Sequence, residues 1–332
     1  MTIPDNPHIQ GAFFKAIGYL DRSKNIGVSI SGGSDSDIAL DFMHQCGVLD
    51  RCQVFIFDTG LEYQATWEHI DYLKDRYGIE IDRIRAKQSI PSCCKQYGQP
   101  FISKMVSMNI ERLQRAGFDW SDDRPFEQLV NDYQGVRWNL KWWTNNNQNL
   151  RMSNISYNRF LKEFLMDHPP KHKISQVCCQ RAKKDTAKEY YKKANLDIVV
   201  LGLRQAEGGV RAIRYKSCYE SQEKGPDKYM PIWWFTDQDK KEYKRFYNIC
   251  NSKCYTQYGM RRTGCAGCPF DLQLKTTMEI MKDHEPKLYR AVSNVFGKSH
   301  ELTEQYHQYR AIKYAEEKRA KMKTQPLEAW AQ

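Results

Sequence analysis

The chain has 332 residues, of which 41% are hydrophobic, so it is long enough and apolar enough to bury a sizeable core. This composition excludes a mainly disordered chain, and no apolar run approaches the length of a membrane span. Residues 1–20 lack the basic start and the cleavage site of a secretory signal, so we expect a cytoplasmic protein. The net charge of +11 favours an anionic partner, although a solvated basic surface explains it equally well.

Strands and helices alternate in the first part of the chain. The predicted strands are short and apolar and lie at residues 25–31, 52–60 and 79–86. The predicted helices are amphipathic and lie at residues 38–47 and 62–78. This alternation predicts an α/β fold with a doubly wound, mostly parallel sheet, in which ligands bind at the carboxyl ends of the strands.

The alternation stops in a Trp-rich and Asn-rich segment and then resumes. The segment predicts a mostly helical insert with long loops. After it come a predicted helix at 180–195, a strand at 196–204, a loop that contains Gly and Lys, and a helix at 239–249. We therefore expect four parts: the first half of the α/β domain at 1–88, the insert at 89–174, the second half with cysteines at 175–275, and a charged helical tail at 276–332.

A glycine-rich loop lies between the first predicted strand and the first predicted helix. It consists of Ser31, Gly32, Gly33, Ser34, Asp35 and Ser36. Glycines let the backbone approach an anion, the serines add hydroxyl donors, and a helix N-terminus supplies unpaired N–H groups. The loop therefore predicts a pyrophosphate site. A Gly-Gly turn with Asp35 or Ser34 capping the helix is the alternative.

Four cysteines form a pattern that suits a metal cluster. Cys178 and Cys179 are adjacent, a spacing that is poor for a normal disulfide, and Cys265 and Cys268 form a C-x-x-C pair downstream. Cytosolic thiols stay reduced, and an iron–sulfur cluster needs four thiolates. We therefore predict that these four cysteines bind a cluster.

Two other interpretations of the cysteines stay open. Cys250 and Cys254 with the downstream C-x-x-C pair have a spacing that could form a zinc site, which would leave the adjacent pair unexplained. A second adjacent pair, Cys93 and Cys94, has no partner motif, and it is a reactive dithiol, a sulfur relay or simply buried.

Several basic residues flank these motifs near predicted strand ends. A guanidinium group binds phosphate or sulfate oxygens through its bidentate fork, and a lysine binds them as a point charge. As a set they favour an anion site, although each alone is as easily a solvated surface residue. They are Arg181, Lys183, Lys184, Arg204 and Arg211.

These motifs together resemble a known enzyme family. Residues 31–36 resemble the PP-loop motif SGGxDS of the adenine-nucleotide α-hydrolases, which split ATP into AMP and pyrophosphate. Residues 58–70 (DTGLEYQATWEHI) resemble the second strand end of the phosphoadenylylsulfate (PAPS) and adenylylsulfate (APS) reductases, and residues 178–184 and 201–212 extend the similarity. The resemblance covers residues 25–270 apart from the insert, and it implies a PP-loop fold.

The resemblance also implies roles for individual residues. Asp58, Thr59 and Gly60 would lie beside the nucleotide, together with the phosphate loop, Arg204 and Arg211. Asp35 would lie near Mg²⁺ or the phosphates. The predicted catalytic residues are Asp35, Arg181, Lys183 and Arg204, and the predicted ligands of one [4Fe–4S] cluster are Cys178, Cys179, Cys265 and Cys268.

The chain departs from the reductases in two respects. No cysteine follows Cys268, whereas those reductases finish with a cysteine that attacks the sulfate sulfur. The phosphate loop is complete here, whereas the reductases usually carry a degenerate version. Both departures favour an ATP pyrophosphatase that activates an acceptor for sulfur transfer, similar to those of DNA phosphorothioation, with a cysteine desulfurase or another sulfur donor as partner. The alternatives are an APS or PAPS reductase with an atypical nucleophile such as Cys93 or Cys94, and a noncatalytic nucleotide sensor.

The insert gives evidence about the chemical nature of the acceptor. Its tryptophans are interleaved with basic residues, so they could stack bases while the cations contact phosphates of DNA or RNA. Aromatic residues at this spacing are more often the core of a small helical subdomain. Transfer-RNA thiolation is a rival within the same chemistry. The residues concerned are Trp120, Trp138, Trp142 and Trp143, with Arg124, Arg137, Lys141, Arg151 and Arg159.

Overall fold

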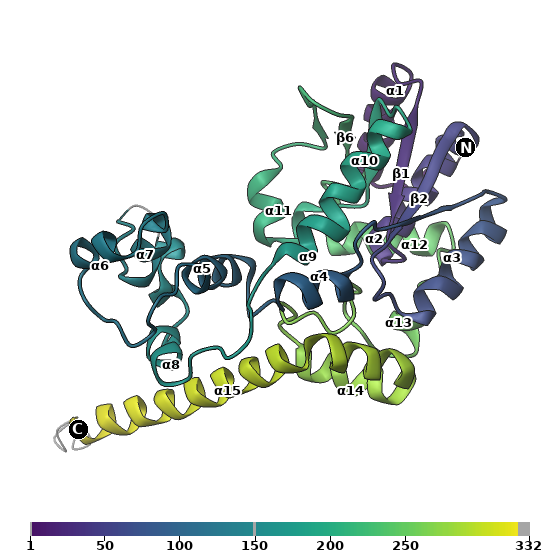
Figure 1. Ribbon diagram of the computed structural model, residues 1–332. Helices are drawn as coiled ribbons and strands as arrows, with labels where there is room; N and C mark the ends of the chain where they lie inside the picture. Colours follow the sequence, from purple (N-terminus) through teal and green to yellow (C-terminus); the bar gives the residue numbers. More distant parts are fainter. Residues whose placement is uncertain (1, 149–150, 325–332) are drawn as a thin grey trace, which may run out of the picture. The chain divides into compact units, whose positions relative to one another are not determined.

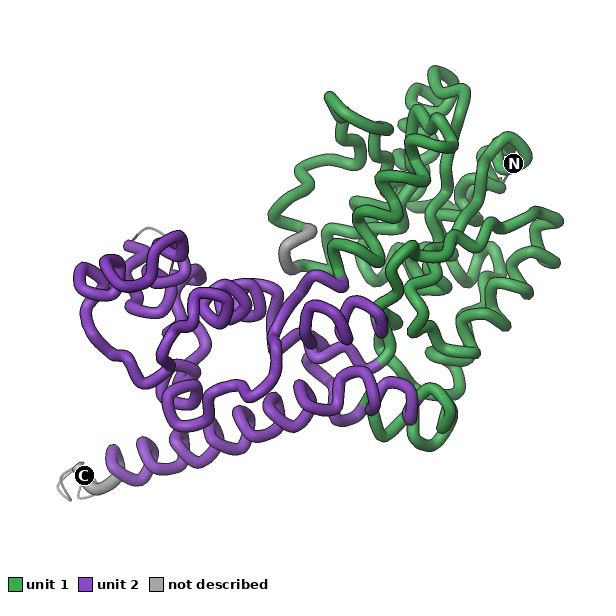
Figure 2. The backbone as a smooth tube through the Cα atoms, in the orientation of Figure 1, with its two compact units in different colours: residues 1–90, 179–266, 277–288 green, residues 91–178, 267–276, 289–332 purple. Residues whose placement is uncertain are grey.

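The computed structural model describes residues 2–148 and 151–324. The chain forms two compact units, which Figure 2 colours separately. Unit 1 comprises residues 1–90, 179–266 and 277–288, and unit 2 comprises residues 91–178, 267–276 and 289–332. Because the chain passes between them repeatedly, each unit is built from segments that are distant in sequence.

Unit 1 is an α/β unit. Its strands are β1 (Ile26–Ile30), β2 (Cys52–Asp58), β3 (Asp82–Arg85), β4 (Ile198–Leu201), β5 (Tyr219–Glu220) and β6 (Asp227–Tyr229). Its main helices are α1 (Pro7–Leu20), α2 (Ser34–Gln45), α3 (Gln64–Tyr77), α10 (Thr186–Lys193), α11 (Gly209–Arg214), α12 (Asp237–Phe246), α13 (Lys253–Thr256) and most of α14 (Leu274–His284). Shorter turns are η1 (Leu49–Arg51), η5 (Gln205–Glu207) and η4 (Gln180–Asp185), which is a π-helical segment.

The strands form one sheet that confirms the predicted fold class. The described residues give six strands in the order β3-β2-β1-β4-β6-β5, and β1 pairs in parallel with β2 on one side and β4 on the other (Figure 1). Only β5 runs antiparallel to its neighbour within the described part. The hairpin of β5 and β6 occupies the segment for which the sequence predicts a loop. The rest is the doubly wound, mostly parallel sheet expected from the sequence.

Alternating side chains divide the sheet into two apolar faces. Ile26, Val28 and Ile30 of β1 face a core that includes side chains of α1, α2, α3 and α12. Phe55 of β2 and Val199 of β4 face the opposite core, against aromatic side chains of α10. This alternation follows from the pleat of a strand, which sends successive side chains to opposite sides. Helices therefore cover both faces of the central strands.

Unit 2 is mainly helical within its described residues. Its helices are α4 (Ile90–Tyr97), α5 (Lys104–Arg115), α6 (Phe126–Asp132), α7 (Arg137–Trp143), α8 (Leu161–Asp167), α9 (Val177–Cys179), most of α15 (Pro286–Thr324), and the short turns η2 (Arg151–Ser153) and η3 (Ile155–Tyr157). Trp142 and Trp143 are buried in its core, which also receives Leu302 and Tyr306 from α15. Two of the predicted base-stacking tryptophans therefore serve the packing of the unit.

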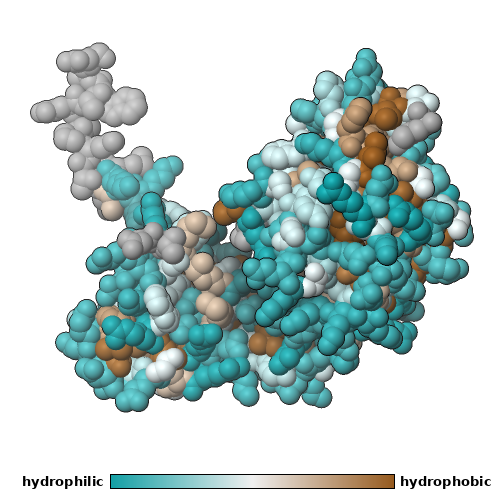
Figure 3. Space-filling view, turned by 90° about the horizontal axis from the view of Figure 1, so that it is seen from above, coloured by the Kyte–Doolittle hydropathy of each residue, from teal (hydrophilic) through white to brown (hydrophobic). Residues whose placement is uncertain are grey.

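The surface is mostly hydrophilic on the face that Figure 3 shows, with smaller hydrophobic patches. Among the described helices, none combines the length and the apolar character that crossing a membrane requires.

Candidate functional site

The predicted phosphate loop connects the carboxyl end of β1 to the start of α2. Gly33 is the N-cap residue of α2, and Ser34 is its first helical residue. Gly32 has a φ of +63°, a left-handed conformation that favours glycine. The loop therefore lies where parallel sheets bind ligands, with the N–H groups of a 12-residue helix opening onto it.

Hydroxyl groups hold the loop amides in place. The Ser31 and Gly33 N–H groups both donate to Ser36 Oγ at 3.2 Å, and that hydroxyl donates to the Gly33 carbonyl at 2.7 Å. Among the described residues, the Ser34 N–H makes a single hydrogen bond, a long one of 3.4 Å to the hydroxyl of Tyr255. Since long hydrogen bonds are weak, an anion oxygen can readily replace this partner. Ser36 thus shapes the loop, and Ser34 presents the more available amide.

Gly202 lets the end of β4 pack directly against the loop. A Cβ atom at this position would lie 2.5 Å from the carbonyl oxygen of Asp35 and 2.5 Å from Cα of Ser36. Real side chains do not tolerate such contacts with backbone. A residue without a side chain is therefore required where β4 touches the start of α2.

Asp35 is the centre of an ion-pair cluster. Its Oδ1 atom lies 3.1 Å from Nε of Arg204 and 2.7 Å from Nζ of Lys240. Arg204 is buried and also contacts Asp237 at 2.9 Å. Burial alone would raise the pKa of Asp35, but the two cations outweigh it, so this pKa lies below its usual value. The structure thus brings the predicted Asp35 and Arg204 together, and α12 adds Lys240.

A second lysine of α12 reaches the loop itself. Nζ of Lys244 donates to Oγ of Ser34 at 3.1 Å and also to the side-chain carbonyl of Asn251. The pKa of Lys244 is lowered to about 8, chiefly by burial and also by the charge of Lys240, although Asp37 and Asp35 favour the charged form. Neither lysine is marked by the sequence, because α12 follows the loop by about 200 residues and shows only the pattern of a charged surface helix.

The turn after β2 is held by acidic side chains. Asp58 accepts hydrogen bonds from Arg83 of β3 at 2.9 Å and from the Gly60 N–H at 2.9 Å. Glu62 accepts from the N–H and hydroxyl groups of Thr59 at 3.1 and 2.6 Å. The predicted residues Asp58, Thr59 and Gly60 therefore form one ordered turn, and Glu62 is a further member that the sequence analysis did not single out.

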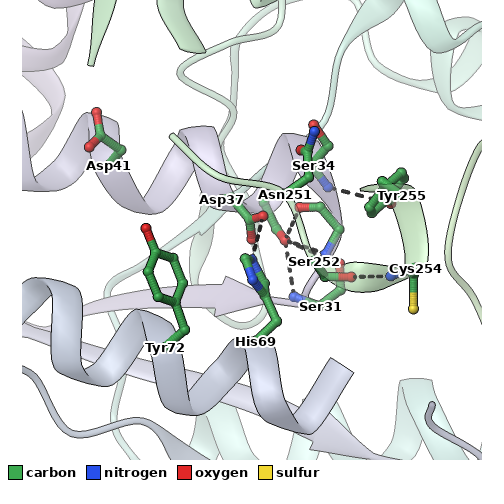
Figure 4. Close-up of polar contacts among 12 residues, drawn as sticks. Ser31, Ser34, Asp37, Asp41, His69, Tyr72, Asn251, Ser252, Cys254 and Tyr255 are labelled. Carbon is green, nitrogen blue, oxygen red and sulfur yellow. Dashed lines mark hydrogen bonds and ion pairs between the residues drawn. The ribbon is translucent and has the colours of Figure 1, made fainter. Parts of the chain in front are cut away.

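A buried acid–base pair lies behind the loop. Oδ2 of Asp37 on α2 lies 2.8 Å from Nε2 of His69 on α3, and Figure 4 shows the two side chains pointing toward one another. Both are buried, and Oδ1 of Asp37 has no hydrogen-bond partner among the described residues. A pocket of about 310 Å³ adjoins the pair. It is lined by Ala65, Glu68, His69, Tyr72, Cys250, Asn251, Ser252 and Lys253.

The remaining predicted cations differ in their surroundings. Arg181 is exposed and pairs with Asp185, four residues along, at 3.1 Å. Electrostatic interaction and a hydrogen bond with Cys265 raise the pKa of Lys183, with smaller contributions from Cys179 and Glu62. The side chain of Arg211 lies outside the described residues. Of the predicted cations, only Arg204 has a described contact with the phosphate loop, through Asp35.

The four predicted cluster cysteines divide between the two units. Cys179 and Cys265 belong to unit 1, where both lie near Lys183, and Cys178 and Cys268 belong to unit 2. Among the described residues, no group of three or more His, Cys, Asp or Glu side chains is arranged to hold a metal ion. Cluster ligation therefore stays a prediction. Cys93 and Cys94 are buried, and Cys250 is exposed.

No protein-family profile matches the chain. A 90-residue segment, 26% of the chain, is 34% identical to the uncharacterized protein MJ0066 of Methanocaldococcus jannaschii, and the match spans only 18% of that protein. Two solved structures are similar at low sequence identity. A phosphoadenylyl-sulfate (PAPS) reductase from Candida auris, in complex with phosphate, is 12% identical with a TM-score of 0.44, over 76% of this chain and 87% of that one.

Another similar structure is the U34-tRNA thiolase NcsA from Methanococcus maripaludis with its [4Fe-4S] cluster. It is 13% identical with a TM-score of 0.37, over 91% of this chain and 79% of that one. We therefore base the functional proposal on the residues of this chain.

Proposed function

We propose that the chain is an ATP pyrophosphatase that activates an acceptor for sulfur transfer. The observation that carries the proposal is the phosphate loop, where N–H groups, the Ser34 hydroxyl and the cations Lys240 and Lys244 surround the first turn of α2. These groups suit the phosphate chain of a nucleotide. A complete SGGxDS loop further favours cleavage at the α-phosphate, by resemblance to the α-hydrolases.

The proposed reaction has three steps. An acceptor oxygen attacks the α-phosphorus of ATP, so that AMP becomes bonded to the acceptor and pyrophosphate leaves. A persulfide, formed on a cysteine desulfurase or another donor, then attacks the activated acceptor through its outer sulfur, and AMP leaves with the acceptor oxygen. A thiol reductant then cleaves the S–S bond that joins the acceptor to the donor and releases the thiolated acceptor. The loop amides and the α12 lysines stabilise the negative charge that pyrophosphate carries away.

Asp35 has a carboxylate oxygen suited to a magnesium ion. Both neighbouring cations contact Oδ1, and within the described residues Oδ2 has no partner. Mg²⁺ prefers carboxylate and phosphate oxygens, and when bound it would neutralise phosphate charge. Arg204 then acts as a positioning residue, because it is buried and fixes Asp35 and Asp237.

The acceptor we favour is nucleic acid, with DNA before RNA. Trp138 on α7 is 71% exposed, unlike the buried Trp142 and Trp143. Nζ of Lys141 lies 5.0 Å from the Trp138 ring centre, and the adjacent Arg137 is also exposed. Neither cation pairs with a carboxylate among the described residues.

Two other predicted basic residues of the insert, Arg124 and Arg159, are less available. Arg124 pairs with Asp122 and Asp132 at 2.7 Å each, and Arg159 pairs with Glu317. The α7 surface therefore offers one aromatic ring and two uncompensated cations, a combination that suits a single strand.

The activity is tested by incubating anaerobically purified protein with ATP and Mg²⁺ and measuring pyrophosphate, with and without a sulfur donor and single-stranded DNA or RNA. We expect ATP to be converted to AMP and pyrophosphate. Thiol-dependent release of sulfite from APS or PAPS would instead support a reductase. Nucleotide binding with no turnover under any of these conditions would support a sensor.

The acceptor surface is tested by fluorescence anisotropy with labelled single-stranded oligonucleotides. Trp138→Ala removes one stacking platform, so we expect affinity to fall by about 1–3 kcal/mol. Tyr157→Ala is the matched control, because Tyr157 is an exposed aromatic residue elsewhere in the same unit. Equal affinities of the two variants would exclude the α7 surface as the binding site.

A further inference from the structure

We propose that Lys244 is a phosphate-binding residue of the nucleotide site, supplied by α12 to a loop that lies about 200 residues earlier in the chain. This inference rests on the proposed function, because it identifies a residue that would hold the phosphate chain of ATP. No motif in the sequence marks Lys244. The contacts around its amino group single it out.

Three donors meet at the first residue of α2. The N–H and hydroxyl groups of Ser34 belong to the helix N-terminus, and Nζ of Lys244 lies 3.1 Å from that hydroxyl. The Ser34 N–H has only its long bond to Tyr255. An anion oxygen placed here would receive hydrogen bonds from the amide and from the ammonium group together, and such charge-assisted bonds are the stronger kind.

The partners of Lys244 are neutral, which distinguishes it from its neighbours. Lys240, one turn earlier, pairs with Asp35, and Arg204 pairs with both Asp35 and Asp237. Lys244 instead contacts a serine hydroxyl and the Asn251 amide, and it pairs with no carboxylate among the described residues.

Holding a partly buried cation without a directly bonded counter-charge costs free energy. A binding site for an anionic ligand explains why the ligand-free protein bears this cost. Asp37 lies close enough to act on Lys244 electrostatically, but its Oδ2 is bonded to His69.

Asn251 links Lys244 to the pocket beside His69. Its carbonyl receives a hydrogen bond from Nζ, and the residue also lines that pocket. In the ligand-free protein Asn251 therefore holds the amino group against Ser34. A phosphate oxygen can replace the Asn251 carbonyl as the hydrogen-bond acceptor of Nζ without a large movement of α12.

The charge of Lys244 also predicts that anion binding depends on pH. Its pKa of about 8 is set by burial, by Lys240, which opposes the charge, and by Asp37, Asp35 and Cys250, which favour it. Raising the pH through this value removes the proton from the ligand-free protein. Anion binding should therefore weaken above this pH, because only the protonated amine attracts phosphate.

The test measures binding of inorganic pyrophosphate and of Mg²⁺ with α,β-methylene-ATP by titration calorimetry near neutral pH. Lys244→Gln should weaken both ligands by about 10- to 100-fold, the range for a hydrogen bond to a charged group. Lys244→Arg should retain binding. Lys241→Gln, an exposed lysine of the same helix, is the matched control and should bind as the wild type does.

Measuring pyrophosphate affinity at a series of pH values distinguishes loss of the Lys244 charge from misfolding of a variant. Wild-type affinity for pyrophosphate should fall as the pH passes about 8, whereas Lys244→Arg should show no such fall, because arginine stays charged. Wild-type affinity in Lys244→Gln, or no pyrophosphate binding by the wild type, would overturn the inference. Pyrophosphate binding that depends on Lys244, with no ATP turnover, would sustain the inference and overturn the proposed function.

Discussion

Replacing Lys244 with methionine should stabilise the ligand-free protein at neutral pH. Methionine keeps an unbranched side chain of similar length and removes the charge. The pKa of Lys244 falls from 10.5 to about 8 in the folded protein, chiefly through burial. At 1.36 kcal/mol per pKa unit, this difference corresponds to a cost of about 3 kcal/mol for holding the charged lysine in the folded state.

The sign of the pH dependence follows from proton linkage. Below the folded pKa the lysine is charged in both states, so the folded protein bears the full cost. As the pH rises from about 8 toward 10.5, the folded state loses its proton first and the cost disappears. The stability advantage of Lys244→Met should therefore shrink by about 2 kcal/mol between about pH 7 and about pH 9.5.

Urea unfolding of the wild type and the variant at the two pH values measures this difference. Other titrations shift both proteins equally and cancel in the comparison. Lys241→Met serves as the control, since that side chain is exposed and its difference from the wild type should not vary with pH. A Lys244→Met difference that is the same at both pH values would refute the claim that this lysine is held charged at a cost.

Gly202→Ala should destabilise the protein by about 3 kcal/mol and abolish nucleotide binding, because the new Cβ would lie 2.5 Å from backbone atoms of the phosphate loop. The new Cβ of Gly297→Ala meets open space, so this control variant should keep the stability of the wild type. Similar melting temperatures for the two variants would contradict the close contact at Gly202. His69→Ala removes the hydrogen-bond partner of the buried Asp37 side chain and should cost about 1–3 kcal/mol in urea unfolding, and an unchanged free energy of unfolding would argue against a stabilising role of this hydrogen bond. Serine at any of the four predicted cluster cysteines should abolish bound iron in anaerobically purified protein, whereas Cys250→Ser should not; iron retained in the former would refute the ligand assignment. Chelating Mg²⁺ with EDTA should weaken ATP binding, and unchanged affinity would exclude the metal role of Asp35.

The sheet was predictable because its strands carry strong local signals. Residues 26–30 and 198–201 are short apolar runs with turn residues on both sides, and these runs form β1 and β4. The end of α3 was also predictable from the sequence, because a glycine commonly ends a helix and Gly78 adopts φ +61° at the C-cap. By contrast β5 and β6 have only two and three residues, too few for any periodic pattern. They exist because β6 pairs with β4, which is a tertiary effect.

The candidate site could be predicted only in part, because some of its residues are brought together by tertiary packing alone. Motifs on one continuous segment, such as residues 31–36 and 58–60, were found because their residue types are unusual at that spacing. Lys240 and Lys244 look like ordinary members of a charged amphipathic helix, and only the packing of α12 against α2 gives them a role. Likewise Asp37 and His69 are unremarkable in sequence, and their pairing depends on α3 lying beside α2.

The balance of charge at the loop limits how ATP can bind. Asp35 and Asp237 already compensate Arg204 and Lys240, so among the described cations that contact the phosphate loop or Asp35, Lys244 is the one whose charge is not matched by a directly bonded carboxylate. A triphosphate brings several negative charges into a partly buried site, where uncompensated charge is costly. One lysine and the helix N-terminus cannot balance that charge. If ATP is the substrate, as we propose, we expect a metal ion to arrive with the nucleotide, and we expect unit 1 to receive it at Oδ2 of Asp35, for which no hydrogen bond is described.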